Sequence, residues 1–103
     1  SPDILRCKDL SLNTASYELS GPTGSVVLPR LEYQLMELFM KHPRFVFSTE
    51  HIMEKIWGQD AEAGMDVVWT YIGFLRKKLK QLGASVEIKT VRGAGYSLEE
   101  TTC

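Results

Sequence analysis

Several features that would mark particular protein classes are scarce or missing in this 103-residue sequence. It holds two cysteines, Cys7 and Cys103, near opposite ends, which matches neither a disulfide framework nor a zinc-binding spacing. No apolar run reaches the length needed to span a membrane. The start, residues 1–3, lacks the basic and then apolar pattern of a signal peptide. We therefore expect no membrane association and a reducing, cytoplasmic location.

Signals of catalysis are equally sparse. His42 and His51 belong to no metal-ligand spacing, neither cysteine has a histidine or other base near it in sequence, and the carboxylates form no pair with a pocket. We expect the protein not to be an enzyme and to need neither cofactor nor metal.

The length suits a single domain spanning residues 1–103, with an ordinary apolar content of 44%. The net charge of −1 argues against indiscriminate coating of nucleic acid, but the charge is unevenly distributed. Residues 1–75 hold six basic and ten acidic side chains, whereas residues 76–98 hold six basic and one acidic. Such concentration indicates a local site for a polyanion. The alternative is that these residues merely oppose the dipole at the end of a helix.

The first third of the chain reads as short strands separated by turns. Apolar and partly alternating runs at 4–7, 10–12, 17–19 and 26–28 are broken by Asn, Gly and Pro residues. This pattern predicts a small four-stranded antiparallel sheet that covers a helical core or docks against another domain.

From Pro29 the apolar period changes to that of helices. A first amphipathic helix is predicted from Pro29 to about residue 41, and a second, capped by Ser48, ends at Gly58. A third helix is predicted over about 65–82.

The third helix has one apolar sector and one unusual exposed face. The sector predicted to be buried holds Val68, Ile72, Leu75 and Leu79. The opposite face holds Asp66, Thr70, Gly73 and Lys77, flanked by Trp69, Lys80 and Phe74. A glycine within a helix costs about 1 kcal/mol relative to alanine, so Gly73 suggests close approach of another backbone, or else a tolerated flaw. Trp69 and Phe74 either serve binding or pack against the hairpin or a nearby loop.

The C-terminal part predicts a β-hairpin. Residues 86–91 alternate apolar and polar side chains, Arg92-Gly93-Ala94-Gly95 turns the chain, and residues 96–99 return. The hairpin has a basic tip, and it follows directly on the third helix.

Three helices followed by a hairpin form a winged helix. Several short sequence motifs in these elements also resemble those of a known family. They are Leu28-Pro29-Arg30-Leu31, His42-Pro43, Phe47-Ser48, Ile56-Trp57-Gly58, Leu75-Arg76-Lys77-Lys78-Leu79 and Thr90-Val91-Arg92-Gly93-Ala94-Gly95-Tyr96. With these motifs the chain resembles the C-terminal effector domain of OmpR/PhoB-family response regulators, the transcription factors of bacterial two-component signalling. The resemblance implies an α+β fold: a winged helix-turn-helix with an N-terminal four-stranded antiparallel sheet, three helices and a C-terminal hairpin wing.

The resemblance also implies roles for particular residues. The third helix would lie in the major groove of double-stranded DNA, and the wing, residues 92–95, would place Arg92 in a minor groove. The residues expected to contact or support DNA are Ser48, Thr49, Trp57, Asp66, Trp69, Thr70, Gly73, Phe74, Arg76, Lys77, Lys80, Thr90, Arg92 and Tyr96. Among these, Arg76, Thr90 and Tyr96 would contact phosphates, and the free N–H groups following Ser48 could do likewise.

This sequence departs from the family pattern on the face that would read bases. Trp69 stands where many members have an acidic residue, and Phe74 where they have an arginine able to read guanine. No Arg, Asn or Gln stands on this face, so Thr70 and the aromatic side chains are left to contact thymine methyl groups. Pro29 also replaces the usual Ser or Thr before the first helix.

The resemblance further implies partners. Residues 1–3 would be a linker remnant following an absent receiver domain, binding would occur as self-associated pairs on direct repeats, and loop 58–65 would face RNA polymerase. A different class of function is a winged-helix protein-interaction module with little DNA affinity, suggested by the acidic average charge and by the exposed Trp69 and Phe74.

Overall fold

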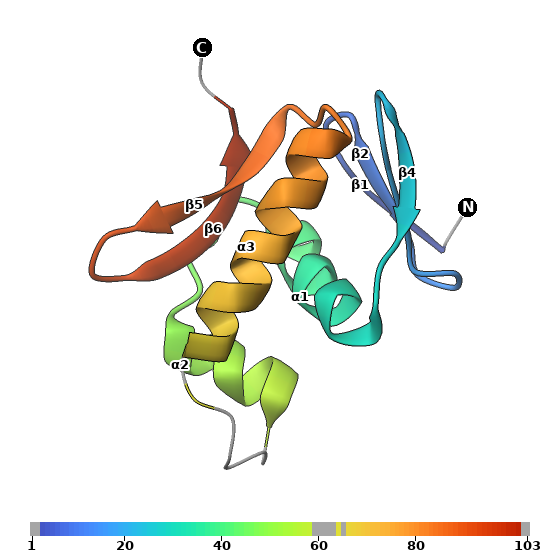
Figure 1. The fold of residues 1–103 in the computed structure, drawn as a ribbon. Coiled ribbons are helices and arrows are strands. Elements are labelled where there is room, and N and C mark those ends of the chain that lie inside the picture. Colours follow the sequence, from blue (N-terminus) through green and yellow to red (C-terminus); the bar gives the residue numbers. More distant parts are fainter. Residues whose placement is uncertain (1–2, 59–63, 65, 102–103) are drawn as a thin grey trace.

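The computed structural model describes residues 3–58, 64 and 66–101, and it begins with a four-stranded sheet (Figure 1). Neighbouring strands pair antiparallel in chain order. The strands are β1 (Ile4–Cys7), β2 (Leu10–Asn13), β3 (Glu18–Gly21) and β4 (Gly24–Val27). The predicted sheet is thus confirmed, but β3 and β4 differ from the predicted 17–19 and 26–28. Tyr17 adopts a left-handed φ of 65° and belongs to the turn, which moves the start of β3 to Glu18.

The first helix, α1 (Arg30–Lys41), begins after Pro29, whose fixed φ of −59° suits the residue before a helix. No side-chain hydrogen bond caps this end, in keeping with the loss of the usual Ser or Thr. Leu35, Met36 and Phe39 are fully buried and Leu31 and Leu38 are half-buried, so the predicted amphipathic helix is confirmed.

The second helix contains a change of register that the sequence pattern did not predict. Ser48 accepts a hydrogen bond from the His51 backbone N–H at 3.1 Å, which confirms the predicted cap of α2 (Thr49–Ile52). The chain then widens into a π-helical segment, η1 (Met53–Trp57). Gly58, with φ of 57°, ends it by donating its N–H to the Met53 carbonyl oxygen at 2.9 Å. π turns occur frequently at functional sites.

The third helix, α3 (Asp66–Gln81), crosses the middle of the molecule in front of α1 (Figure 1). Its predicted apolar sector is confirmed, because Val68, Ile72, Leu75 and Leu79 are all buried. Gly83, with φ of 67°, follows the helix and lets the chain turn towards the next strand. No helix in the described part of the chain is both long and apolar enough to cross a bilayer.

The wing consists of β5 (Val86–Val91) and β6 (Gly95–Glu100), paired antiparallel along their full length. It projects on the side of α3 opposite the N-terminal sheet (Figure 1). A β-bridge between Phe47 and Tyr96 attaches the wing to the segment preceding α2. The Phe47 N–H donates to the Tyr96 carbonyl oxygen and the Tyr96 N–H to that of Phe47, with nitrogen–oxygen distances of 2.8 and 2.9 Å. The predicted hairpin is therefore confirmed, and its end next to the turn is tied to the segment that precedes α2.

The N-terminal sheet rests against the C-terminal end of α3. The Thr23 hydroxyl donates to the Gln81 carbonyl oxygen at 2.6 Å, and the Thr23 N–H donates to that of Leu82 at 3.1 Å. On the other side of the same junction, Asp9 accepts from the Ser85 N–H at 2.9 Å. The sheet thus covers the helical core, and the predicted α+β winged helix-turn-helix architecture is confirmed.

Candidate nucleic-acid interface

The outer face of α3 is exposed and largely apolar at its centre. Trp69 is 68% exposed and Phe74 is 47% exposed, so neither is packed away against the wing. A Cβ atom added at Gly73 would meet nothing within 4 Å. The Thr70 hydroxyl donates to the Asp66 carbonyl oxygen at 3.1 Å, so its proton is used within the helix. The centre of the face therefore offers mainly aromatic and methyl surface, with the indole N–H of Trp69 as its free side-chain donor.

These side chains surround an open hollow. Its volume is about 340 Å³, and it is lined by Trp69, Thr70, Gly73, Phe74 and Arg76. Gly73 contributes no side chain to this lining, and the space next to its backbone is open. The predicted reading residues are thus brought together around one concave, apolar surface.

A row of aromatic rings in mutual contact supports this surface. Trp57, at the end of η1, contacts the Tyr71 ring edge-on with centroids 5.3 Å apart, and Tyr71 contacts Phe74 in the same manner at 5.5 Å. Trp57 is half-buried, so it supports the face instead of forming part of it. The sequence interpretation missed Tyr71, although its spacing of three residues from Phe74 on a helix places the two rings together.

Arg76 connects α3 to the wing. Its Nε donates to the Ile88 carbonyl oxygen at 2.9 Å, and its Nη2 donates to Thr90 Oγ1 at 2.7 Å. The guanidinium also lies over the Tyr96 ring, 5.8 Å from the centroid. Sequence reasoning assigned Arg76 to phosphate binding alone. The structure adds a role in fixing the wing, with the remaining guanidinium N–H groups left for another partner.

A second hollow, of about 260 Å³, lies between the start of α2 and the wing. Thr49, Thr90 and Tyr96 all line it, so three predicted contact residues meet at one place. Glu50 also lines this hollow and brings a negative charge to it. Ser48 is engaged as the cap of α2, as predicted, and stands beside this group in sequence.

The basic segment 76–98 separates into two groups in space. Lys77 and Lys80 on α3 are exposed, as is Arg92 at the wing tip. Lys78 instead points to the core side, where its Nζ lies 2.5 Å from Oε1 of the buried Glu32 on α1. Part of the segment is thus a structural ion pair, and the rest is available to a polyanion.

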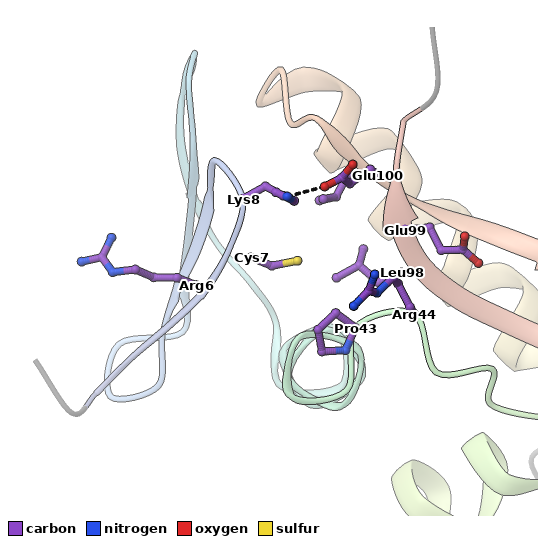
Figure 2. A pocket seen from close by; sticks show the side chains of 9 residues that line it. Arg6, Cys7, Lys8, Pro43, Arg44, Leu98, Glu99 and Glu100 are labelled. Carbon is purple, nitrogen blue, oxygen red and sulfur yellow. Dashed lines mark ion pairs between the residues drawn. The ribbon is translucent and has the colours of Figure 1, made fainter.

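A third hollow, of about 230 Å³, lies between β1 and β6 and is lined by Cys7, Arg44 and Leu98 among others (Figure 2). Lys8 forms an ion pair with Glu100 at its edge. Burial raises the pKa of the Cys7 thiol, so the thiol stays protonated and is a poor nucleophile. The described residues contain no group of three or more His, Cys, Asp or Glu side chains able to hold a metal.

A helix exposed on one face, a preceding capped helix and an attached hairpin with an arginine at its tip define a winged-helix domain of the DNA-binding type. Residues 23–98 match the family model described as "Transcriptional regulatory protein, C terminal". The chain belongs to this family, the OmpR/PhoB-type C-terminal DNA-binding domains. It is a DNA-binding output domain of a transcriptional regulator and not an enzyme.

Individual relatives agree with this assignment. The chain is 41% identical over 98 residues to the transcriptional regulatory protein DltR of Streptococcus agalactiae, covering 95% of this chain and 44% of that protein. It therefore spans less than half the length of the curated relatives it matches. Among solved structures it resembles the C-terminal domain of the nisin resistance regulator NsrR, with 30% identity, a TM-score of 0.77 and coverage of 95% of this chain and 99% of that domain. It also resembles the DNA-binding domain of CpxR from E. coli, with 27% identity, a TM-score of 0.75 and coverage of 96% and 98%.

Proposed function

We propose that this chain binds double-stranded DNA sequence-specifically, as the output domain of a two-component response regulator. In this proposal α3 lies in the major groove and the turn 92–95 places Arg92 in an adjacent minor groove. A narrow minor groove has an enhanced negative potential that attracts a guanidinium. The observation that carries the proposal is the exposed face of α3, joined by Arg76 to a wing that bears Arg92 at its tip.

Two kinds of contact contribute. Lys77, Lys80 and Arg92 are exposed cations for phosphates or the minor groove. Thr49, Thr90 and Tyr96 offer hydroxyl groups around the hollow between the start of α2 and the turn end of the wing. Phosphate contacts of both kinds position the protein on the duplex, whereas base contacts specify the sequence.

Salt dependence of binding to random-sequence duplex DNA provides the first test. Each cation that contacts a phosphate contributes about one to the slope of log affinity against log salt concentration. We expect Arg92→Ala to lower affinity about tenfold and to reduce this slope by up to about one. Arg6→Ala is the matched control, because Arg6 is an exposed arginine on β1 that points away from the helices (Figure 2).

Absence of salt-dependent DNA binding at low salt would refute the proposal. The second candidate, a protein-interaction module, rests on the 68% exposure of Trp69. A protein partner that buries Trp69, together with no DNA affinity, would favour that candidate.

The proposal extends to the longer protein to which such a domain belongs. Self-associated pairs would bind direct-repeat half-sites in the cytoplasm, and a receiver domain would precede residues 1–3. Loop 58–65 would face RNA polymerase, and it lies mostly outside the described residues, as do Ser1 and Pro2. Footprinting of a selected duplex would show one protected half-site or two in tandem.

A further inference from the structure

At the centre of the exposed face of α3, residues 69, 70, 73 and 74 include no Arg, Lys, Asn or Gln, and the indole N–H of Trp69 is their remaining side-chain donor. Among the described residues of this face, only Asp66, Lys77 and Lys80 are charged, and none of the three lines the hollow. The one arginine that lines the hollow, Arg76, has two donors engaged by Ile88 and Thr90. Guanine recognition usually uses a bidentate arginine or lysine, and the two engaged donors of Arg76 tie its guanidinium to the wing.

Apolar surface is what the hollow does offer. Trp69 and Phe74 stand on its two sides, and Gly73 leaves open space between them. In the major groove, the apolar group of a base edge is the C5-methyl of thymine, whereas guanine, cytosine and adenine present only donors and acceptors there. The chemistry of the hollow therefore matches a pyrimidine C5-methyl group.

The Phe74 side of the hollow is also preorganised before DNA binds. Tyr71 and Trp57 hold Phe74 from behind through two edge-on ring contacts, with centroids 5.5 and 5.3 Å apart. An aromatic side chain fixed before binding loses less conformational freedom when a partner arrives. Lys77 and Arg76 flank the same surface, so a polyanion is attracted to it and the hollow is continuous with the proposed DNA contacts.

We propose that Trp69, Gly73 and Phe74 form a receptor for thymine methyl groups, so that the operator is selected by thymine at one or two positions per half-site. This inference rests on the proposed DNA-binding function. It makes the major-groove specificity of this domain depend on apolar contact instead of on hydrogen bonds.

The test replaces thymine by uracil, which removes the C5-methyl group and leaves base pairing unchanged. DNA duplexes that bind the protein are first selected from a pool of random sequences. Each thymidine of a selected duplex is then replaced, one at a time, by deoxyuridine. Burial of one methyl group contributes about 0.8 kcal/mol, which corresponds to about a fourfold change in affinity. We expect a loss of about fourfold at one or two positions per half-site and almost none elsewhere.

Protein variants test whether the loss of affinity on replacing thymine by uracil arises at the hollow. Trp69→Ala and Phe74→Ala should bring the thymine-to-uracil affinity ratio at those positions close to one. Phe45→Ala is the matched control, because Phe45 is a comparably exposed phenylalanine, 52% exposed, in the connection between α1 and α2. It should leave the ratio unchanged. Circular dichroism of each variant establishes that it is folded.

A further duplex pair tests the methyl group itself. At a sensitive position, a 5-methylcytosine–guanine pair should bind more tightly than a cytosine–guanine pair. Salt-dependent binding with a thymine-to-uracil ratio near one at every position would overturn the methyl receptor and leave the proposed DNA-binding function standing. No salt-dependent binding at all would overturn both.

Discussion

Arg76 Nη2 on α3 donates a hydrogen bond to Thr90 Oγ1 on β5 at 2.7 Å, and this contact sets the angle between helix and wing. The same guanidinium donates from Nε to the Ile88 carbonyl oxygen at 2.9 Å. One side chain thus joins the two elements proposed to enter different grooves. A change at this joint affects stability and DNA affinity together.

Thr90→Val and Arg76→Ala separate the two effects. Thr90→Val removes one hydrogen bond and should lower the free energy of unfolding by about 1 kcal/mol. It should weaken DNA binding without changing the salt slope, because a neutral hydroxyl releases no counterion. Arg76→Ala should cost about 2 kcal/mol or more in stability and reduce the slope by about one. Denaturant titration and binding at several salt concentrations measure both quantities. An unchanged slope for Arg76→Ala would mean that this residue only fixes the wing.

Neighbouring lysines of α3 should behave in opposite ways. Lys78→Met leaves the carboxylate of Glu32, which is 6% exposed, without its ion partner and should lower the free energy of unfolding by about 1–3 kcal/mol. Lys77→Met removes the same charge from an exposed position and should change stability by less than about 0.5 kcal/mol. Only Lys77→Met should reduce the salt slope of DNA binding. Equal stability of the two variants would contradict the assigned ion pair.

Gly95→Ala should be among the most destabilising small substitutions in the wing. An added Cβ would lie 1.9 Å from the Phe47 carbonyl oxygen, and the φ of 145° is one that side-chain-bearing residues rarely adopt. Because the clash is with backbone, we expect a loss of at least about 2 kcal/mol. Gly93→Ala is the control: its Cβ meets nothing within 4 Å, and only its φ of 78° opposes alanine. Thermal unfolding of both variants should show the larger decrease for Gly95→Ala.

Gly73→Ala should stabilise the protein and weaken DNA binding. Alanine is favoured over glycine in a helix by about 1 kcal/mol, and the added methyl group meets no atom of the protein within 4 Å. The methyl group would, however, be added at a residue that lines the hollow proposed to receive DNA. Denaturant titration and duplex binding of the same preparation test this pair of opposite effects. Undiminished affinity would show that Gly73 is a tolerated flaw of the helix.

Features with a local cause were predictable from the sequence. The buried sector of α3, the cap formed by Ser48 and the glycine-rich hairpin turn all follow from periodicity or from side chains near their own backbone. Periodicity placed Trp69 away from the apolar sector but left open whether it packs against the hairpin or a loop, and the structure shows it exposed.

Other features lacked a local signal. The π-helical register of η1 and the left-handed Tyr17 that delays β3 depend on how those segments pack, so the pattern of residue types did not indicate them. The pairing of Glu32 with Lys78 joins residues 46 positions apart, and no spacing rule connects them.

For this protein, then, the order of its residues determined which elements form and which face of α3 remains exposed, because periodicity is a property of neighbouring positions. Only the tertiary structure decided which partners the side chains on and around that face contact. It drew Arg76 into the joint with Thr90 and Lys78 onto Glu32, and it set Tyr71 behind Phe74. The physical reason is that a charged or aromatic side chain takes whichever partner the packed elements bring within reach, and that partner is often distant in sequence.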